Sequence, residues 1–143
     1  MQLVGFGLKK VLAERYPNFK RGHINTNIEF KEVEKEEIGF LKDAEGLKIS
    51  FVFSISYLDA EKKEEKYGEV TFEGEMALSV SKEEFKEFTK SWKKKQIPEE
   101  YHISLINFII RKCSTKALAL EEDLAIPFHI PFPQVKKPDQ PQQ

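Results

Sequence analysis

The chain has one cysteine in 143 residues, which excludes an internal disulfide and is typical of a reducing compartment. Acids and bases nearly cancel, and the formal net charge of −1 gives no global field that attracts nucleic acid or an anionic membrane. No apolar run reaches the roughly 18 residues of a membrane-spanning helix. The first residues also lack the charged, then apolar, then small-residue order of a secretory signal peptide. The sequence therefore predicts a cytoplasmic protein with no nucleic-acid partner and no membrane insertion.

Most catalytic and metal-binding signatures are missing as well. The three histidines, His23, His102 and His129, lack the spacing of metal ligands. His102 and Cys113 are about 16 Å apart along one expected helix, which is too far for a nucleophile–base pair. Cys113 follows the apolar positions of that helix and is expected to be an unreactive core residue. The sequence therefore predicts no enzyme, no catalytic residue, no metal and no cofactor.

What the chain does contain is enough apolar material for one domain. Hydrophobic residues make up 40% of the chain and aromatic residues 12%, which argues against disorder and for a real core. We expect a single domain over residues 1–135. Residues 136–143 form a polar tail that is too poor in apolar groups to fold, so we expect it to be disordered.

Three stretches alternate between apolar and polar residues with the period of a β-strand, at residues 24–31, 47–58 and 67–80. Short polar links join them, which predicts an antiparallel meander with one solvated face. Residues 34–43 either extend the first strand or link it irregularly. Residues 3–14 fit a helix or a strand equally well, because their glycines weaken a helix but their apolar residues could line one of its faces.

Two helices are expected after the strands. Ser81 and Glu84 have the spacing of a capping box, and Phe85, Phe88 and Trp92 then lie on one helical face. A longer helix runs from Pro98, where proline is tolerated at the first helical position, to about residue 122. The predicted fold is α+β, with an antiparallel meander sheet of three to four strands, two helices packed on one face and a C-terminal proline-rich extended arm.

The long helix has more apolar residues than one sheet-facing stripe requires. Its single-face stripe is Ile106, Ile109, Cys113, Ala117 and Leu120, and further apolar residues lie off that stripe. This surplus has to be covered by more of the chain or by another subunit. We predict a homo-oligomer whose interface includes Ile103, Ile106, Phe108 and Ile110.

Acidic residues alternate along the strand 67–80, at Glu69, Glu73 and Glu75. Paired carboxylates can carry out acid–base chemistry, but acids with a period of two on a strand are typical of the wet side of a sheet. Nothing in the sequence indicates a closed pocket around them. We interpret them as a solvated face that can also serve as a docking surface for a basic partner.

The segment 125–135 is an apolar arm interrupted by Pro127, Pro131 and Pro133, which hold it extended and remove N–H donors. Its apolar side chains alternate with these prolines and with His129. The arm either folds back over its own sheet or helix, or builds one wall of a groove for an extended peptide, and both can hold. We predict a peptide-binding groove formed by Ile126, Phe128, Ile130 and Phe132.

The chain resembles the SecB-type export chaperones over about residues 20–135. Residues 67–74, Tyr-Gly-Glu-Val-Thr-Phe-Glu-Gly, look like the last strand of that family. Residues 98–111 are similar to its long interface helix, and residues 124–135 look like its proline-punctuated crossover loop. The short last helix of the family has no counterpart here, which leaves the shape of the groove open.

This resemblance implies an ATP-independent holdase that assembles as a dimer or a dimer of dimers and holds unfolded polypeptide clients. It also implies a role for Glu69, which falls where the family carries an acid that docks the export motor. Related SecB-like proteins serve toxin–antitoxin pairs, so the client can be a dedicated antitoxin.

Two other functions stay open from the residues alone. The first is a small-ligand-binding α+β protein or an enzyme with a cavity between sheet and helices, for which the apolar strand faces offer Thr26 and Tyr57 as polar candidates. The second is a structural assembly module that forms an oligomer without an exposed groove.

Overall fold

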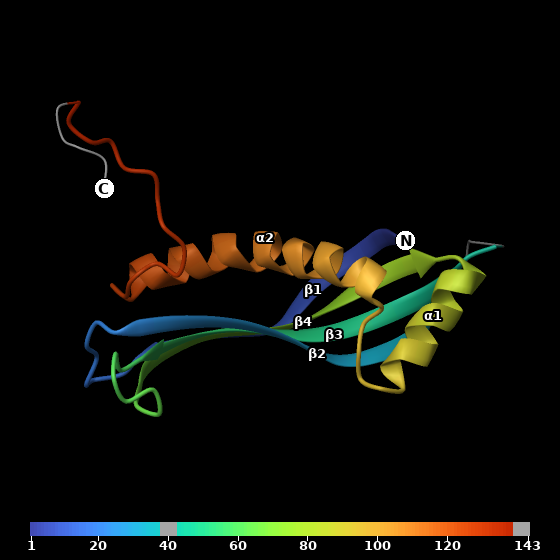
Figure 1. Cartoon of the computed structure of the whole chain (residues 1–143), viewed down its shortest axis with the longest axis horizontal. Coiled ribbons are helices and arrows are strands. Elements are labelled where there is room, and N and C mark those ends of the chain that lie inside the picture. The colour runs from blue at the N-terminus through green and yellow to red at the C-terminus, as the bar shows by residue number, and fades with distance from the viewer. Residues whose placement is uncertain (38–42, 139–143) are drawn as a thin grey trace.

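The computed structural model of the chain describes residues 1–37 and 43–138 (Figure 1). Four antiparallel strands form one sheet, and two helices follow them in the chain. The bounds are Gln2–Arg15 for β1, His23–Glu36 for β2, Glu45–Leu58 for β3, Lys66–Val80 for β4, Lys82–Trp92 for α1 and Glu99–Asp123 for α2. The predicted α+β class is confirmed.

The strands lie in the order β1-β4-β3-β2. The expected meander is the run β2–β3–β4, and β1 lies beside β4 rather than beside β2, which is a Greek-key order. β1 and β2 are therefore the two edges of the sheet. Of the ambiguous residues 34–43, residues 34–36 extend β2, and residues 38–42 lie outside the described residues.

β1 resolves the ambiguity of residues 3–14 in favour of a strand. Its pairing with β4 shifts register between Leu3 and Gly5 and between Leu8 and Lys10. Each such bulge inserts a residue and interrupts the strict alternation of faces, so the sequence does not show a clean period of two. The inward side chains that pack against the core are Leu3, Phe6, Leu8 and Ala13.

The core lies between one face of the sheet and the two helices. Every second side chain of β3 is buried, and β4 follows the same pattern. α1 contributes Phe88, and α2 contributes Leu105, Ile109, Cys113 and Ala117. This continuous apolar layer is what holds the helices on one face of the twisted sheet (Figure 1).

The predicted capping box of α1 is confirmed. The Ser81 hydroxyl accepts a hydrogen bond from the backbone N–H of Glu84 at 3.1 Å, and the Glu84 carboxylate accepts one from the N–H of Ser81 at 2.8 Å. Pro98 is the N-cap of α2 rather than its first helical residue, and the helix ends at Asp123. The rings of Phe88 and Tyr101 stack at 5.1 Å and join the two helices.

The buried row of α2 differs from the predicted stripe. Its residues are four apart, Leu105, Ile109, Cys113, Ala117 and Glu121, with Ser114 beside them. Ile106 and Leu120, which we placed on the stripe, are half-buried at its margin. The row of α2 that contacts the sheet is thus narrower than the predicted stripe and slightly rotated around the helix axis. The last residue of this row is Glu121.

α2 ends in a Schellman motif that starts the arm. Ala125 adopts a positive φ of 52°, and the backbone N–H groups of Ala125 and Ile126 donate to the carbonyls of Glu122 and Glu121 at 3.1 and 3.0 Å. Ile126 is buried against the core, so the chain turns back onto the domain before the arm continues. The expected disorder of the tail falls partly on residues 139–143, which lie outside the described residues.

Neither helix in the described ranges has the length and apolar character needed to cross a membrane.

Candidate functional site

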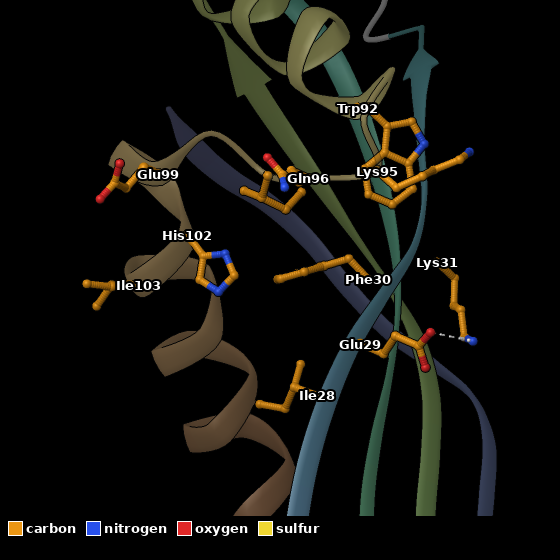
Figure 2. Close-up of a pocket in the computed structure, with 11 residues that line it drawn as sticks. Ile28, Glu29, Phe30, Lys31, Trp92, Lys95, Gln96, Glu99, His102 and Ile103 are labelled. Carbon is orange, nitrogen blue, oxygen red and sulfur yellow. Dashed lines mark ion pairs between the residues drawn. The ribbon is translucent and has the colours of Figure 1, made fainter.

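An open groove separates the edge strand β2 from α2 (Figure 2). Its larger part has a volume of about 800 Å³ and is lined by Ile28 and Phe30 from β2 and by His102 and Ile103 from α2. The rings of Phe30 and His102 meet edge to face at 5.9 Å, whereas Ile103 points away from β2 (Figure 2). A smaller hollow of about 400 Å³ shares Ile28, His102 and Ile103 with it and adds Ile106 and Ile110 from α2. The shared residues make the two hollows one trough, which we call the edge groove.

The strand that forms one side of the edge groove has a free edge. β2 pairs with β3 on one side, and within the described residues no strand pairs with its other side. Every second backbone N–H and C=O of such an edge points outward and can pair with an added extended chain. The edge groove therefore combines main-chain partners on β2 with isoleucine side chains on α2.

The structure divides the residues that we predicted as an oligomer interface. Ile103, Ile106 and Ile110 lie together along the edge groove, and Ile103 is 70% exposed. Phe108 is half-buried on the other flank of α2, where its ring meets that of Phe6 in β1 at 5.6 Å. One helix therefore presents two different apolar surfaces, one toward each edge of the sheet.

A second groove lies where the arm begins, with a volume of about 830 Å³. We call it the arm groove. The β1–β2 connection and the start of β2 form one side, Tyr57 reaches it from β3, and the arm forms the other side. The four residues that we predicted as a peptide-binding groove, Ile126, Phe128, Ile130 and Phe132, all line it.

The arm both folds back on the domain and leaves apolar surface open. Ile126 is 4% exposed, whereas Phe128, Ile130 and Phe132 are 40%, 39% and 53% exposed. The rings of Phe128 and Phe132 lie 4.9 Å apart and form a small aromatic surface. One apolar side chain anchors the arm, and three remain available for a partner.

A cluster of buried polar side chains fixes the arm at His129, and sequence reasoning missed it. The Glu121 carboxylate accepts a hydrogen bond from the Tyr57 hydroxyl and one from the backbone N–H of His129 at 2.9 Å. Its other oxygen lies 2.8 Å from Nδ1 of His129. The Ser114 hydroxyl lies 3.0 Å from Nε2 of the same ring. We call these four residues the latch.

The electrostatics of the latch follow from its burial. The carboxylate of Glu121 is completely buried, and a buried carboxylate is costly unless it is paired and hydrogen-bonded. Burial, helped by the hydrogen bond to Glu121, raises the pKa of Tyr57 above its usual range, so the phenol stays protonated and donates. Burial also raises the pKa of the Cys113 thiol to about 11, which agrees with the interpretation of Cys113 as an unreactive core residue.

The contacts run from Ser114 to His129 and from His129 to Glu121, as in the triad of a serine hydrolase. The surroundings of these residues do not suit that chemistry. Ser114 is 7% exposed, and none of these three residues lines the edge groove or the arm groove. Ser114 also lies inside a helix, where backbone N–H groups are already used by the helix and cannot form an oxyanion hole. The arrangement can hold the arm in place, because it joins α2, β3 and the arm.

A weak sequence signal for the latch exists in retrospect. Glu121 continues the row of buried residues four apart on α2, where an acid has to find partners. His129 is the one imidazole in an otherwise apolar and proline-rich arm. Neither signal says which residues meet, because the contact requires the chain to reverse after α2.

Of the remaining predicted residues, Glu69 lines neither groove, whereas Thr26 lines the edge groove. Glu69 forms an ion pair with Lys66 and its side chain is 21% exposed, so the expected docking acid carries a neutralising neighbour. Thr26 is exposed on β2, where it lines the smaller hollow of the edge groove. Among the residues that the structure describes, no group of three or more His, Cys, Asp or Glu is placed to hold a metal ion.

A search against family models finds no match, and no curated protein matches the sequence. Among solved structures, the chain is similar to the SecB-like chaperone of Mycobacterium tuberculosis, determined in complex with a ChAD peptide from an antitoxin. The sequences are 14% identical, the TM-score is 0.43, and the alignment covers 96% of this chain and 91% of the other. A likeness this distant establishes neither the family nor the function of the chain.

Proposed function

We propose that this protein is an ATP-independent holdase that binds extended, apolar segments of unfolded polypeptides. The observation that carries the proposal is the course of β2. The start of this strand, His23 and Ile24, lines the arm groove, and residues 26–31 line the edge groove. One unpaired strand edge therefore borders both grooves over about 30 Å of extended chain.

Binding along such an edge needs no nucleotide. The backbone of a client can pair with β2, and alternate client side chains can contact Ile103 and Ile110 in the edge groove or Phe128 and Phe132 in the arm groove. Apolar burial contributes about 25 cal/mol per Å². A few such contacts, less the cost of ordering the client, support reversible binding on the order of micromolar affinity.

The exposed apolar flank of α2 also supports the proposed homo-oligomer. Ile103 and Ile110 are 70% and 39% exposed. In a dimer or tetramer a second copy would bury them in place of a client, and the client would then bind in the arm groove. Docking of an export motor at Glu69 and dedication to an antitoxin remain narrower forms of the proposed function. All of them require a polypeptide to bind in the grooves.

The test is suppression of aggregation of a thermally unfolding model client without ATP. The double variant Phe128→Asp with Phe132→Asp should lose most of this activity, because it places two charges on the exposed wall of the arm groove. Val135→Asp is the matched control, since Val135 is fully exposed on the same arm but does not line the groove. No suppression by the wild type at several-fold molar excess would refute the proposal.

The alternative of a hydrolase is favoured by one observation, the order Ser114–His129–Glu121. It predicts covalent labelling by a serine-directed fluorophosphonate probe that is lost in Ser114→Ala. We expect no labelling of the folded protein, because the serine is sealed beneath the arm. Mass spectrometry of the intact protein distinguishes the two functions.

A further inference from the structure

The arm groove combines an exposed apolar wall with several basic side chains. Arg15, Lys20 and Arg21 line it together with His23, and among the residues that the structure describes no aspartate or glutamate lines it. The chain as a whole has a formal net charge of −1. These cations are therefore a local concentration of positive charge beside an apolar wall.

Among the described residues none of the three cations forms an ion pair, but Arg15 is engaged in holding the fold together. Arg15 uses its guanidinium to hold the end of α2, donating to the carbonyl of Ala125 at 2.7 Å, and it lies over the Phe19 ring at 4.7 Å. Lys20 and Arg21 are exposed, and within the described part of the chain neither forms an ion pair. Both residues line the arm groove, so their charge is available to a ligand that occupies it.

The edge groove provides an internal comparison. Its lining contains Glu29 and Glu99 as well as Lys31 and Lys95, and Lys31 forms an ion pair with Glu29 at 3.0 Å (Figure 2). Charges of both signs balance there. A client that follows β2 therefore meets a neutral groove at one end and a positive groove at the other.

We infer that the arm groove selects segments of polypeptide in which aromatic or aliphatic residues are flanked by aspartate or glutamate. The apolar side chains of such a segment would contact Phe128 and Phe132, and its carboxylates would face Lys20 and Arg21 on the opposite side. Complementary charges favour this partner and disfavour a lysine-rich segment of equal hydrophobicity. The inference rests on the proposed function and adds the chemistry of the client.

The test compares two fluorescein-labelled decapeptides with the same Phe and Leu positions, one with glutamate and one with lysine between them, by fluorescence anisotropy on the full-length protein. We expect the acidic peptide to bind at least ~10-fold more tightly at low ionic strength. The difference should shrink at about 0.5 M salt, because exposed charges are screened there. In Lys20→Glu with Arg21→Glu the preference should disappear or reverse.

The matched control is Lys82→Glu with Lys86→Glu on α1, which makes the same change in net charge at exposed positions outside the arm groove. It should keep the preference for the acidic peptide. Equal binding of both peptides, or an unchanged preference in the Lys20 and Arg21 variant, would overturn the charge selection while leaving polypeptide binding intact. Absence of binding by either peptide would overturn the proposed function itself. Tighter binding of laurate than of the acidic peptide would overturn the choice of a polypeptide as ligand.

Discussion

Nδ1 of His129 lies 2.8 Å from Oε1 of Glu121, and the two side chains are 2% and 0% exposed. One residue belongs to the arm and the other to the last turn of α2. Their contact decides where the arm runs, because Ser114 and Tyr57 complete the hydrogen bonds on either side. The apolar wall of the arm groove therefore depends on a polar contact beneath it.

Replacing His129 by alanine should release the arm and destabilise the domain. The change leaves one oxygen of the buried Glu121 carboxylate without its hydrogen-bond partner, which costs about 3 kcal/mol. We expect a lower urea midpoint and rapid proteolysis within residues 125–135. His102→Ala is the control, since that imidazole is exposed and should leave arm proteolysis unchanged. An equally protected arm in His129→Ala would contradict the latch.

Replacing Ala125 by glycine should stabilise the protein. Ala125 has a φ of 52° at the end of α2, and a residue with a Cβ atom is disfavoured there by about 1 kcal/mol. Glycine removes that cost but gains entropy in the unfolded chain, so a net gain of about 0.5 kcal/mol is expected. Ala119→Gly, at an exposed position inside the same helix, should instead destabilise by about 1 kcal/mol. Thermal and urea unfolding of both variants measure the difference.

The cap of α1 should make stability depend on acid pH. The hydrogen bond from the Ser81 backbone, followed by a contact with the Met1 amine, lowers the pKa of Glu84 from 4.5 to about 2. Because the folded pKa is the lower one, the contribution is fully present above about pH 5 and is lost as the pH falls toward 2. Glu84→Gln should cost about 0.5–1 kcal/mol at pH 7.

The measurement for the cap is urea unfolding of wild type and Glu84→Gln at pH 7 and pH 3. The gap in unfolding free energy should narrow at pH 3. Glu83→Gln is the control, because Glu83 lies in the same first turn but is exposed and does not bond the cap. A gap that stays constant with pH would mean that the carboxylate charge does not stabilise the helix.

The thiol of Cys113 should be inert in the folded protein. It is fully buried, and burial raises its pKa to about 11, so the reactive thiolate is scarce at neutral pH. Ellman's reagent should react with one equivalent of thiol in denaturant and with almost none under native conditions. Fast native labelling would show that α2 separates from the sheet much more readily than its packing indicates.

Local sequence patterns were enough to predict some elements of the fold but not others. Alternation in residues 47–58 and 67–80 was enough to predict β3 and β4, because these central strands bury a whole face. The capping box at Ser81 and Glu84 was predicted from a spacing of three, because its hydrogen bonds stay within one turn. β1 could not be assigned, because two register shifts disturb its alternation.

In the candidate site, too, local patterns predicted some features and contacts between distant segments decided others. The alternating apolar residues of the arm indicated a groove wall, and the structure places all four of them on the arm groove. The split between Phe108 and the isoleucines of α2 could not be predicted, since it depends on which strand lies under each flank of the helix. The latch could not be predicted either, because it joins residues from β3, α2 and the arm.

The sequence by itself determined the α+β class, the central strands, the helix starts and the apolar character of the arm, because each follows from hydrogen bonds and burial among near neighbours in the chain. The tertiary structure alone decided the position of β1, the rotation of α2, the latch and the placement of the cations of residues 15–23 beside the apolar arm. These features depend on contacts between segments far apart in sequence, and a local pattern does not contain the distances that bring such segments together.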